Sequence, residues 1–418
     1  MAEGSAAAIR GPGRRSMTRH TWRTPLTVLV GGTAILLLSF GLRQNLGLYM
    51  APISTGLGWD REVFAFAVAL QSLVWGISTP FMGWLADRYG PGRVVAAGGS
   101  VYAAGLWLMA GASAPMDATI GVGFMTGFGM SMTGFPIVLA TVSRVAPPAR
   151  RSIYLGIASA GGSSGQLLLV PFGQFLLTEN GWSAALLILA GMAALIVPLA
   201  AILAGGNRLP ADEATSQRIG AALREAGGHG GYHLLNAGYF VCGFQTMFIG
   251  AHLPAYLSDL GQPAWLGATA LALIGGLNIV GCLFWAHLGA RHSMKNLLAI
   301  IYGARAVIMA GFVMLPISPA TVIAFACLMG LLWLATVPLT TGVVARIFGT
   351  RFIATLVGIT FFSHQIGSFL GIWLGGIVYD AMGNYDAIFW GGVALGVAAA
   401  ALHLPIDDRP LRPAAAAA

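Results

Sequence analysis

The chain alternates long apolar runs with short polar segments over most of its length. Crossing a bilayer as a helix takes about 20 apolar residues, and twelve runs meet that requirement. Runs this long predict helices, because the strands of a membrane barrel need only about 10 alternating residues. We therefore expect an all-α polytopic membrane protein with twelve transmembrane helices. The runs cover approximately 26–52, 63–86, 93–113, 116–143, 152–177, 182–204, 232–259, 265–289, 296–316, 319–345, 351–377 and 386–406.

The few charges of the chain are distributed as membrane topology requires. Only 9% of the residues are charged and 57% are hydrophobic, with a mean hydropathy of +0.78. Nineteen of the 22 Lys and Arg residues lie in the terminal segments and in alternate loops, whereas the opposite loops hold one, Arg61. By the positive-inside rule, we expect a multi-pass protein of the cell (inner) membrane with both termini cytoplasmic. This distribution also accounts for the net charge of +8 without a nucleic-acid partner.

The sequence repeats itself at an offset of 202 residues. Prolines, basic residues and glycines recur at this spacing; Pro52 matches Pro254, for example, and Arg144 matches Arg346. Both copies begin on the same side of the membrane, so the halves are parallel repeats, which in transporters enclose a site at mid-depth. We expect a cytoplasmic tail over 1–24, six-helix bundles over 25–204 and 232–406, a cytoplasmic linker over 205–231 and a tail over 407–418.

A short polar motif follows the second apolar run. Residues 83–93 read GWLADRYGPGR, which resembles the signature loop of the major facilitator superfamily. The resemblance implies a gate that stabilises one conformation through contacts at cytoplasmic helix ends. A carboxylate suits this task because it binds helix N-termini, such as that of the eleventh helix, and pairs with arginine. The alternative is a determinant of topology alone. The gating residues would be Gly83, Asp87, Arg88, Gly90 and Arg93.

The fifth apolar run carries a second resemblance. Residues 150–165 read RRSIYLGIASAGGSSG, which is similar to a motif of monocarboxylate transporters and their bacterial oxalate/formate-type relatives. That family also has an Asp-Arg pair on the eighth helix, where this chain has Asn278. The resemblance implies transport of small organic anions, with proton symport and anion exchange both open as coupling modes.

Two arginines, Arg43 and Arg305, lie inside apolar runs, and none of the fourteen Asp and Glu residues lies at membrane depth. A charge at the bilayer centre costs roughly 3 kcal/mol or more and usually marks a substrate or ion path. We therefore expect Arg43, on the first helix, to bind a substrate carboxylate through two parallel hydrogen bonds. The competing interpretation is a side chain that snorkels or caps carbonyl groups. Arg305, on the ninth and peripheral helix, is equally consistent with a cavity role and with bonding to neighbouring carbonyls.

Further polar residues on the apolar runs are candidate neighbours of the anion. The repeat places Gln245 opposite Arg43 across the axis between the halves. His364 can titrate near neutral pH and either lines the cavity or packs inside the bundle. Small residues around these positions are more often packing surfaces than sites. The remaining candidates, each of which could instead serve only in packing, are Gln71, Gln166, His252, Asn278 and Gln365.

These features predict a secondary transporter of small organic anions, mono- or dicarboxylates, that works by alternating access. The sequence holds no nucleotide-binding loop, metal-spaced cluster or nucleophile motif, so we expect no enzyme activity, no cofactor and no metal. The expected partners are the anion, protons in the symport case and the lipid bilayer. We expect the protein to be a monomer. The alternatives are an efflux transporter of drugs or metabolites and a non-transporting membrane receptor.

Overall fold

The computed structural model describes residues 23–204, 220, 223–349 and 353–411. Most of the expected N-terminal tail, most of the expected linker and the end of the chain lie outside the described residues. Within the described residues, all regular elements are helices and no strand is present. The all-α prediction is confirmed.

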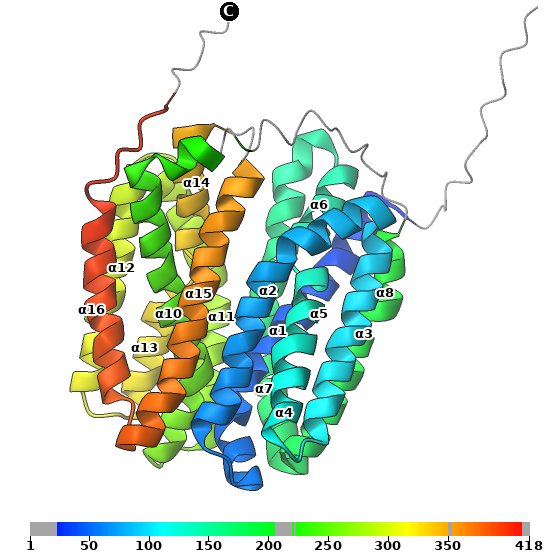
Figure 1. The fold of residues 1–418 in the computed structure, drawn as a ribbon, viewed down its shortest axis with the longest axis vertical. Helices are drawn as coiled ribbons and strands as arrows, with labels where there is room; N and C mark the ends of the chain where they lie inside the picture. The colour runs from blue at the N-terminus through cyan, green and yellow to red at the C-terminus, as the bar shows by residue number, and fades with distance from the viewer. Residues whose placement is uncertain (1–22, 205–219, 221–222, 350–352, 412–418) are drawn as a thin grey trace, which may run out of the picture.

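The helices form two groups along the chain. The N-terminal half contains α1 Pro25–Leu57, α2 Arg61–Tyr89, α3 Pro91–Ala110, α4 Pro115–Ala118, η1 Thr119–Met125, α5 Thr126–Thr133, α6 Phe135–Val145, η2 Pro148–Arg150, α7 Arg151–Ala194 and α8 Ile196–Leu203. The C-terminal half contains α10 Gly230–Asp259, α11 Ala264–Gly289, α12 Met294–Met314, α13 Pro319–Leu332, α14 Thr336–Phe348, α15 Ile353–Met382 and α16 Asp386–His403. Figure 1 shows the two halves standing side by side.

The described helices provide apolar segments for twelve membrane crossings. Among the described residues, eleven continuous segments are long and apolar enough to span a membrane, and the longest, Ile153–Leu203, has 51 residues. That segment reverses at Gly181, whose φ of 73° is open to glycine and strained for other residues. It therefore supplies two crossings, as the sequence predicts. The crossings that contain α5–α6 and α13–α14 are each interrupted, at Gly134 and between Leu332 and Thr336.

We name the two ends of the bundle by the chain segments they carry. The terminal face holds the start of α1, the end of α16 and the loop between α2 and α3; it is uppermost in Figure 1. The distal face holds the turns between α1 and α2, between α10 and α11, and between α15 and α16.

Within each half, the first helix packs closely against the helix of the fifth crossing. A Cβ atom on Gly165 of α7 would collide with the carbonyl oxygen of Leu37 in α1, and Gly367 of α15 meets Phe240 of α10 in the same way. Such small residues let two backbones approach in a membrane bundle. Gly165 and Gly367 are 202 residues apart, but Leu37 and Phe240 are 203 apart. The first helix of the second copy is thus one residue out of register with its partner helix.

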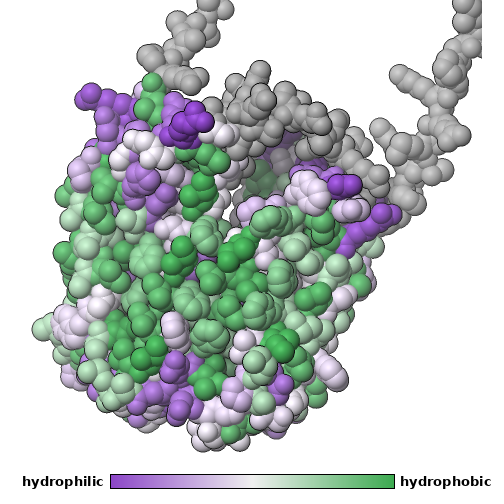
Figure 2. Space-filling model, in the orientation of Figure 1, coloured by the Kyte–Doolittle hydropathy of each residue, from purple (hydrophilic) through white to green (hydrophobic). Residues whose placement is uncertain are grey.

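The halves meet mainly through α2 with α15, α7 with α11, and α1 with α10. Polar contacts join them from mid-depth, where Gln365 donates to the Ser72 carbonyl at 3.0 Å, to the distal face, where Arg61 meets Asp259 at 2.5 Å. In Figure 2 the surface is notched between the halves near the terminal face and continuous towards the distal face. This arrangement is closed on the distal side.

Candidate functional site

Arg43 lies near the middle of α1, at the interface between the halves. Its side chain is only 7% exposed. The Nε atom donates to Oε1 of Gln71 at 3.2 Å, and Nη2 donates to the Ser72 hydroxyl at 2.7 Å. Nη1 has a weaker acceptor, the Met247 sulfur at 3.0 Å from the other half. Because a guanidinium has five N–H donors, two remain without an acceptor among the described residues.

A small cavity lies beside this guanidinium. Arg43 is the one charged residue that lines it in the described part of the chain, and Gln44 is the other polar side chain there. None of the ion pairs among the described residues involves Arg43. A buried cation without a paired anion is costly, so the Nη1 and Nη2 edge is suited to a carboxylate that would replace the sulfur contact. The apolar lining comprises Leu46, Gly47, Val68, Met247, Gly250, Ala251 and Ile372.

Gln71, Gln166 and Gln365 lie close to this cavity in the polar network. Gln71 accepts from Arg43 and donates to the Thr126 hydroxyl at 2.6 Å, which fixes its amide orientation. Gln166 accepts from Gln44 at 2.9 Å and donates to the Leu271 carbonyl of the other half at 2.8 Å. Gln365 donates to the Ser72 carbonyl. These three predicted residues therefore surround or support Arg43, and two of them also bridge the halves.

Arg305 lies apart from Arg43, at the interruption between α13 and α14. It is fully buried, and Nη2 donates to the carbonyl groups of Leu332, at 2.6 Å, and Trp333. Nη1 reaches the Cys242 sulfur at 3.3 Å. A cation suits this position because carbonyl groups at a helix C-terminus lack intrahelical partners and carry partial negative charge. The geometry is that of the carbonyl-bonding alternative.

Asn278 contacts the same interruption. Its Oδ1 atom accepts from the Leu334 amide at 2.9 Å, and its Nδ2 donates to Ser163 of the N-terminal half at 2.9 Å. It thus links the interrupted crossing to α7. Backbone without helical partners is tolerated at membrane depth only where protein groups or a cavity satisfy it, and Arg305 and Asn278 do so here.

Gln245 and His364 point into the C-terminal half. Gln245 donates to the Gly392 carbonyl of α16 at 2.9 Å, so the structure does not bring it to Arg43. The register of 203 makes Thr246, not Gln245, the packing counterpart of Arg43. His364 contacts Gln365 Oε1 at 3.1 Å and lies 5.0 Å from the Tyr239 ring, between α10 and α15.

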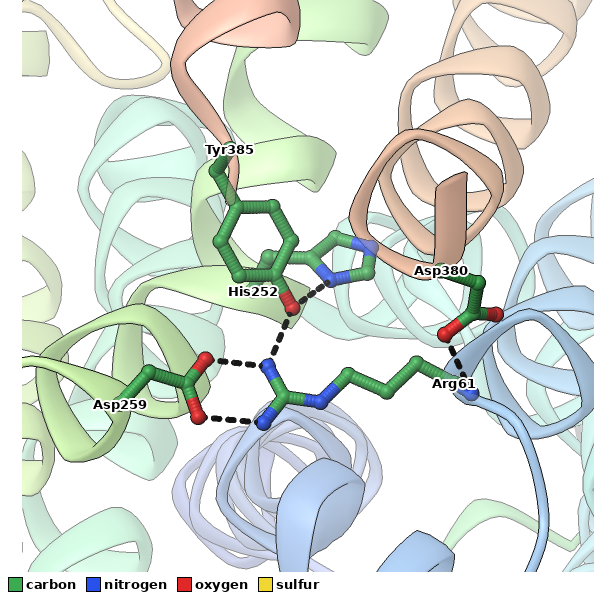
Figure 3. A network of polar contacts seen from close by, with 5 residues as sticks. All are labelled: Arg61, His252, Asp259, Asp380 and Tyr385. Atoms are coloured by element: carbon green, nitrogen blue, oxygen red, sulfur yellow. Dashed lines mark hydrogen bonds and ion pairs between the residues drawn. The ribbon is translucent and has the colours of Figure 1, made fainter. Parts of the chain in front are cut away.

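A second network closes the distal face (Figure 3). Arg61, at the start of α2, forms a bidentate ion pair with Asp259 at the end of α10, with both N–O distances 2.5 Å. Its Nη1 also donates to the Tyr385 hydroxyl at 2.8 Å, and that hydroxyl contacts Nδ1 of His252 at 3.2 Å. Arg61 and Tyr385 are at most one-tenth exposed. We call these residues, with Asp380, the distal latch.

Asp380 completes the distal latch by capping a helix of the opposite half. Its carboxylate accepts from the backbone amides of Arg61, at 3.1 Å, and Glu62, at 2.7 Å. The N-cap residue of α2, Asp60, makes no such side-chain bond itself. Free N–H groups at a helix N-terminus attract carboxylates. The sequence interpretation assigned the distal latch no role except for His252, although Arg61 is the one basic residue of the distal loops.

The gating motif lies at the terminal end of α2. Asp87 pairs with Arg144 at 2.6 Å within the N-terminal half, and Arg88 lies 5.4 Å from the Trp84 ring. Gly90 ends α2 with a φ of 95°, and α3 begins at the next residue, two before Arg93. A Cβ on Gly83 would contact nothing. The expected contact of the motif with the start of the eleventh helix involves residues 350–352, which lie outside the described residues.

Two halves with a polar site at mid-depth between them, closed on one face, define a membrane transporter. The chain belongs to the Major Facilitator Superfamily, whose family model matches residues 32–372. It is a multi-pass secondary transporter and not an enzyme. No group of three metal-ligating side chains occurs in the searched, described part of the chain.

Relatives of known sequence and structure agree with this assignment. The chain is 26% identical over 399 residues to an uncharacterized MFS-type transporter, YcxA, of Bacillus subtilis (strain 168), covering 89% of this chain and 91% of that protein. It is 26% identical to monocarboxylate transporter 13 of Bos taurus, with coverages of 84% and 82%. It is 22% identical to the oxalate:formate antiporter of Oxalobacter formigenes, with 92% of each covered.

Solved structures share the fold at low sequence identity. A bacterial homolog of the human lysosomal transporter Spinster, in an inward-facing and occupied conformation, matches with a TM-score of 0.74 and 14% identity over 90% of this chain and 95% of that one. A D-xylose-proton symporter matches with a TM-score of 0.70 and 15% identity over 93% and 98% of the chains. The predicted twelve-helix major facilitator fold is confirmed.

Proposed function

We propose that this protein transports small organic anions that carry one carboxylate, and that Arg43 binds that carboxylate. The observation that carries the proposal is the buried guanidinium of Arg43, which has unused donors, no paired carboxylate and an adjacent cavity. Binding an anion there would neutralise the charge at mid-depth. The name of the monocarboxylate relatives supports this substrate class, and the name of the oxalate:formate antiporter supports small organic anions more broadly.

The cavity favours a monocarboxylate over a dicarboxylate. A second carboxylate would need a second cation, whereas the C-terminal half lines the cavity with Met247, Gly250, Ala251 and Ile372, none of which is charged. These residues suit a substrate whose part away from the carboxylate is apolar, because burying a second charge against apolar atoms without a partner is strongly unfavourable. We therefore propose a substrate with one charged end and a short apolar end.

We further propose that both termini are cytoplasmic and that the protein resides in the cell inner membrane. Under this orientation the distal latch closes the outer side, and the structure is an inward-facing state of an alternating-access cycle. The distribution of Lys and Arg residues supports this orientation. Gln71, Ser72 and Gln365 then orient Arg43, the residue that binds the anion. Arg305 stabilises the interrupted crossing between α13 and α14.

Uptake by proteoliposomes tests the substrate and the ligand together. Wild-type protein should accumulate labelled butyrate and not labelled oxalate. Arg43→Ala should raise the half-saturating concentration about 100-fold or more, because two charge-assisted hydrogen bonds of about 1.5 kcal/mol or more are lost. Arg43→Lys keeps the charge but cannot bind both carboxylate oxygens in parallel. Its half-saturating concentration should lie between those of wild type and Arg43→Ala.

Arg409→Ala is the matched control, since the Arg409 side chain is 88% exposed and far from the cavity in the chain's tail. It should transport like wild type. Unchanged butyrate uptake by a folded Arg43→Ala protein would refute the assignment of Arg43. Imposing a pH gradient, or preloading the vesicles with butyrate, separates proton symport from anion exchange.

A further inference from the structure

His252 is the member of the distal latch that lies next to the Arg43 cavity: it contacts Tyr385 of the latch and Ile372, which lines the cavity. It is fully buried on α10, and both of its ring nitrogens have partners. Nδ1 contacts the Tyr385 hydroxyl at 3.2 Å, and Nε2 contacts the Ile372 carbonyl at 2.8 Å. Figure 3 shows the imidazole behind Tyr385, which in turn contacts Arg61.

The donors in this chain of contacts can be assigned from the partners. Arg61 can only donate, so the Tyr385 oxygen accepts from it and the hydroxyl proton is left for Nδ1 of His252. Nε2 must then carry the imidazole proton, because its partner is the Ile372 carbonyl, which can only accept. The result is one directed series of hydrogen bonds from Arg61 through Tyr385 and His252 to the backbone of α15.

The end of this series is a wall of the cavity. The Ile372 side chain lines the cavity next to Arg43, and so does Ala251, the residue before His252. The approach of the imidazole to α15 depends on Gly375, because a Cβ there would lie 2.5 Å from Nε2. One buried side chain therefore touches both the element that would contact the anion and the residue that orients the latch arginine.

We propose that His252 is a positioning residue that holds the distal latch closed and couples it to occupancy of the cavity, an inference that rests on the proposed anion site. An anion that enters between Arg43 and the apolar wall displaces α15 at Ile372. The displacement breaks the bond from His252, releases Tyr385 and weakens the hold on Arg61. Such coupling is reciprocal, so the state of the latch changes anion affinity by the same factor.

The test measures the distance across the distal face by double electron–electron resonance. Spin labels are placed at Met116→Cys in the N-terminal half and Leu315→Cys in the C-terminal half, whose native side chains are 62% and 55% exposed. The three native cysteines are changed to serine. A longer distance reports an open distal face, and the ratio of long to short populations is the measured quantity.

Without any anion, His252→Ala should raise that ratio roughly tenfold, because Tyr385 loses the contact that orients it and with it the hydrogen bond from the charged Arg61, which is the bond of this series that crosses the halves. His252→Gln should restore the closed state, since its amide can donate to Ile372 and accept from Tyr385. Gly375→Ala should also open the distal face, because the added methyl group on α15 would displace the His252 imidazole. Gly358→Ala, in the same helix with nothing near its Cβ position, is the control and should resemble wild type.

Saturating butyrate provides the second arm. In wild type it should raise the open ratio, and in His252→Ala the ratio should be high and insensitive to butyrate. If His252→Ala leaves the ligand-free distances unchanged while only lowering thermal stability, His252 is a packing residue and the proposal is overturned. If butyrate does not bind wild type at all, the anion proposal and the coupling both fail, whereas the ligand-free result still decides whether His252 holds the latch.

Discussion

Removing one charge of the distal latch should open the distal face. In Asp259→Asn the side chain keeps its size but loses a carboxylate that accepts two hydrogen bonds from Arg61 at 2.5 Å. The two side chains are 27% and 10% exposed, respectively. Exposed ion pairs contribute about 1 kcal/mol or less, and truncating a buried pair costs about 2 to 5 kcal/mol.

We expect a cost near the lower end of that range, about 2 kcal/mol, because Asp259 is partly solvated. Arg61 would also keep its position 3.7 Å from the Tyr379 ring centroid and its bond to Tyr385. A cost of this size changes the open-to-closed ratio about 30-fold. If the open state of wild type is populated at about 1%, the variant would reach about 20 to 25%.

The spin-label pair at Met116 and Leu315 measures this population directly. The matched control is Asp407→Asn, because Asp407 pairs with Arg409 at 3.9 Å and both side chains are more than 60% exposed. The control should leave the distances of wild type unchanged. A distance distribution for Asp259→Asn that matches the control would refute the view that this ion pair holds the halves together.

Two further predictions concern the other charged groups. Arg305→Lys should lower the thermal unfolding temperature, measured by intrinsic fluorescence, because an ammonium cannot bridge the Leu332 and Trp333 carbonyls as a guanidinium does. The half-saturating butyrate concentration should not change. An unchanged unfolding temperature with a raised half-saturating concentration would instead assign Arg305 to anion binding. Asp87→Asn should lower the free energy of unfolding by no more than about 1 kcal/mol, as expected for a half-exposed ion pair, so the unfolding temperature should change little. Uptake should nevertheless slow several-fold. Unimpaired uptake would reduce the motif to a topology determinant.

The sequence predicts the architecture well because the membrane imposes a simple rule. Each crossing must be long and apolar, so twelve crossings can be counted from hydropathy alone. The reversal at Gly181 also follows from the sequence, because the break between two apolar runs falls on a residue that tolerates a positive φ. Parallel halves follow from the repeat, which needs only matching residues at a fixed spacing.

Side-chain direction is harder to predict, as Gln245 illustrates. Pro52 and Pro254 give an offset of 202, and this offset places Gln245 opposite Arg43. The close contacts of α1 and α10 follow an offset of 203 instead. One residue turns a helical side chain by about 100°, so a single shift moves Gln245 from the interface to α16.

Contacts between distant helix ends are equally hidden from the sequence. Arg61 is visible as an isolated basic residue, but its partners Asp259 and Asp380 come from helices nearly 200 and more than 300 residues later. Arg305 shows the same limit. Its burial can be predicted from the apolar run, but its bonds to Leu332 and Trp333 depend on an interruption of the helix that the run does not reveal.

The division of chemistry around the cavity has a consequence for the transport cycle. The groups that hold the Arg43 guanidinium through oxygen, Gln71 and Ser72, belong to the N-terminal half, whereas Met247 and Ile372 of the C-terminal half offer sulfur and hydrocarbon. A bound anion would stay fixed in the frame of the N-terminal half while the other half slides past its apolar end. The two duplicated bundles would then have different roles in transport. The N-terminal bundle would bind the anion, and the C-terminal bundle would move over it.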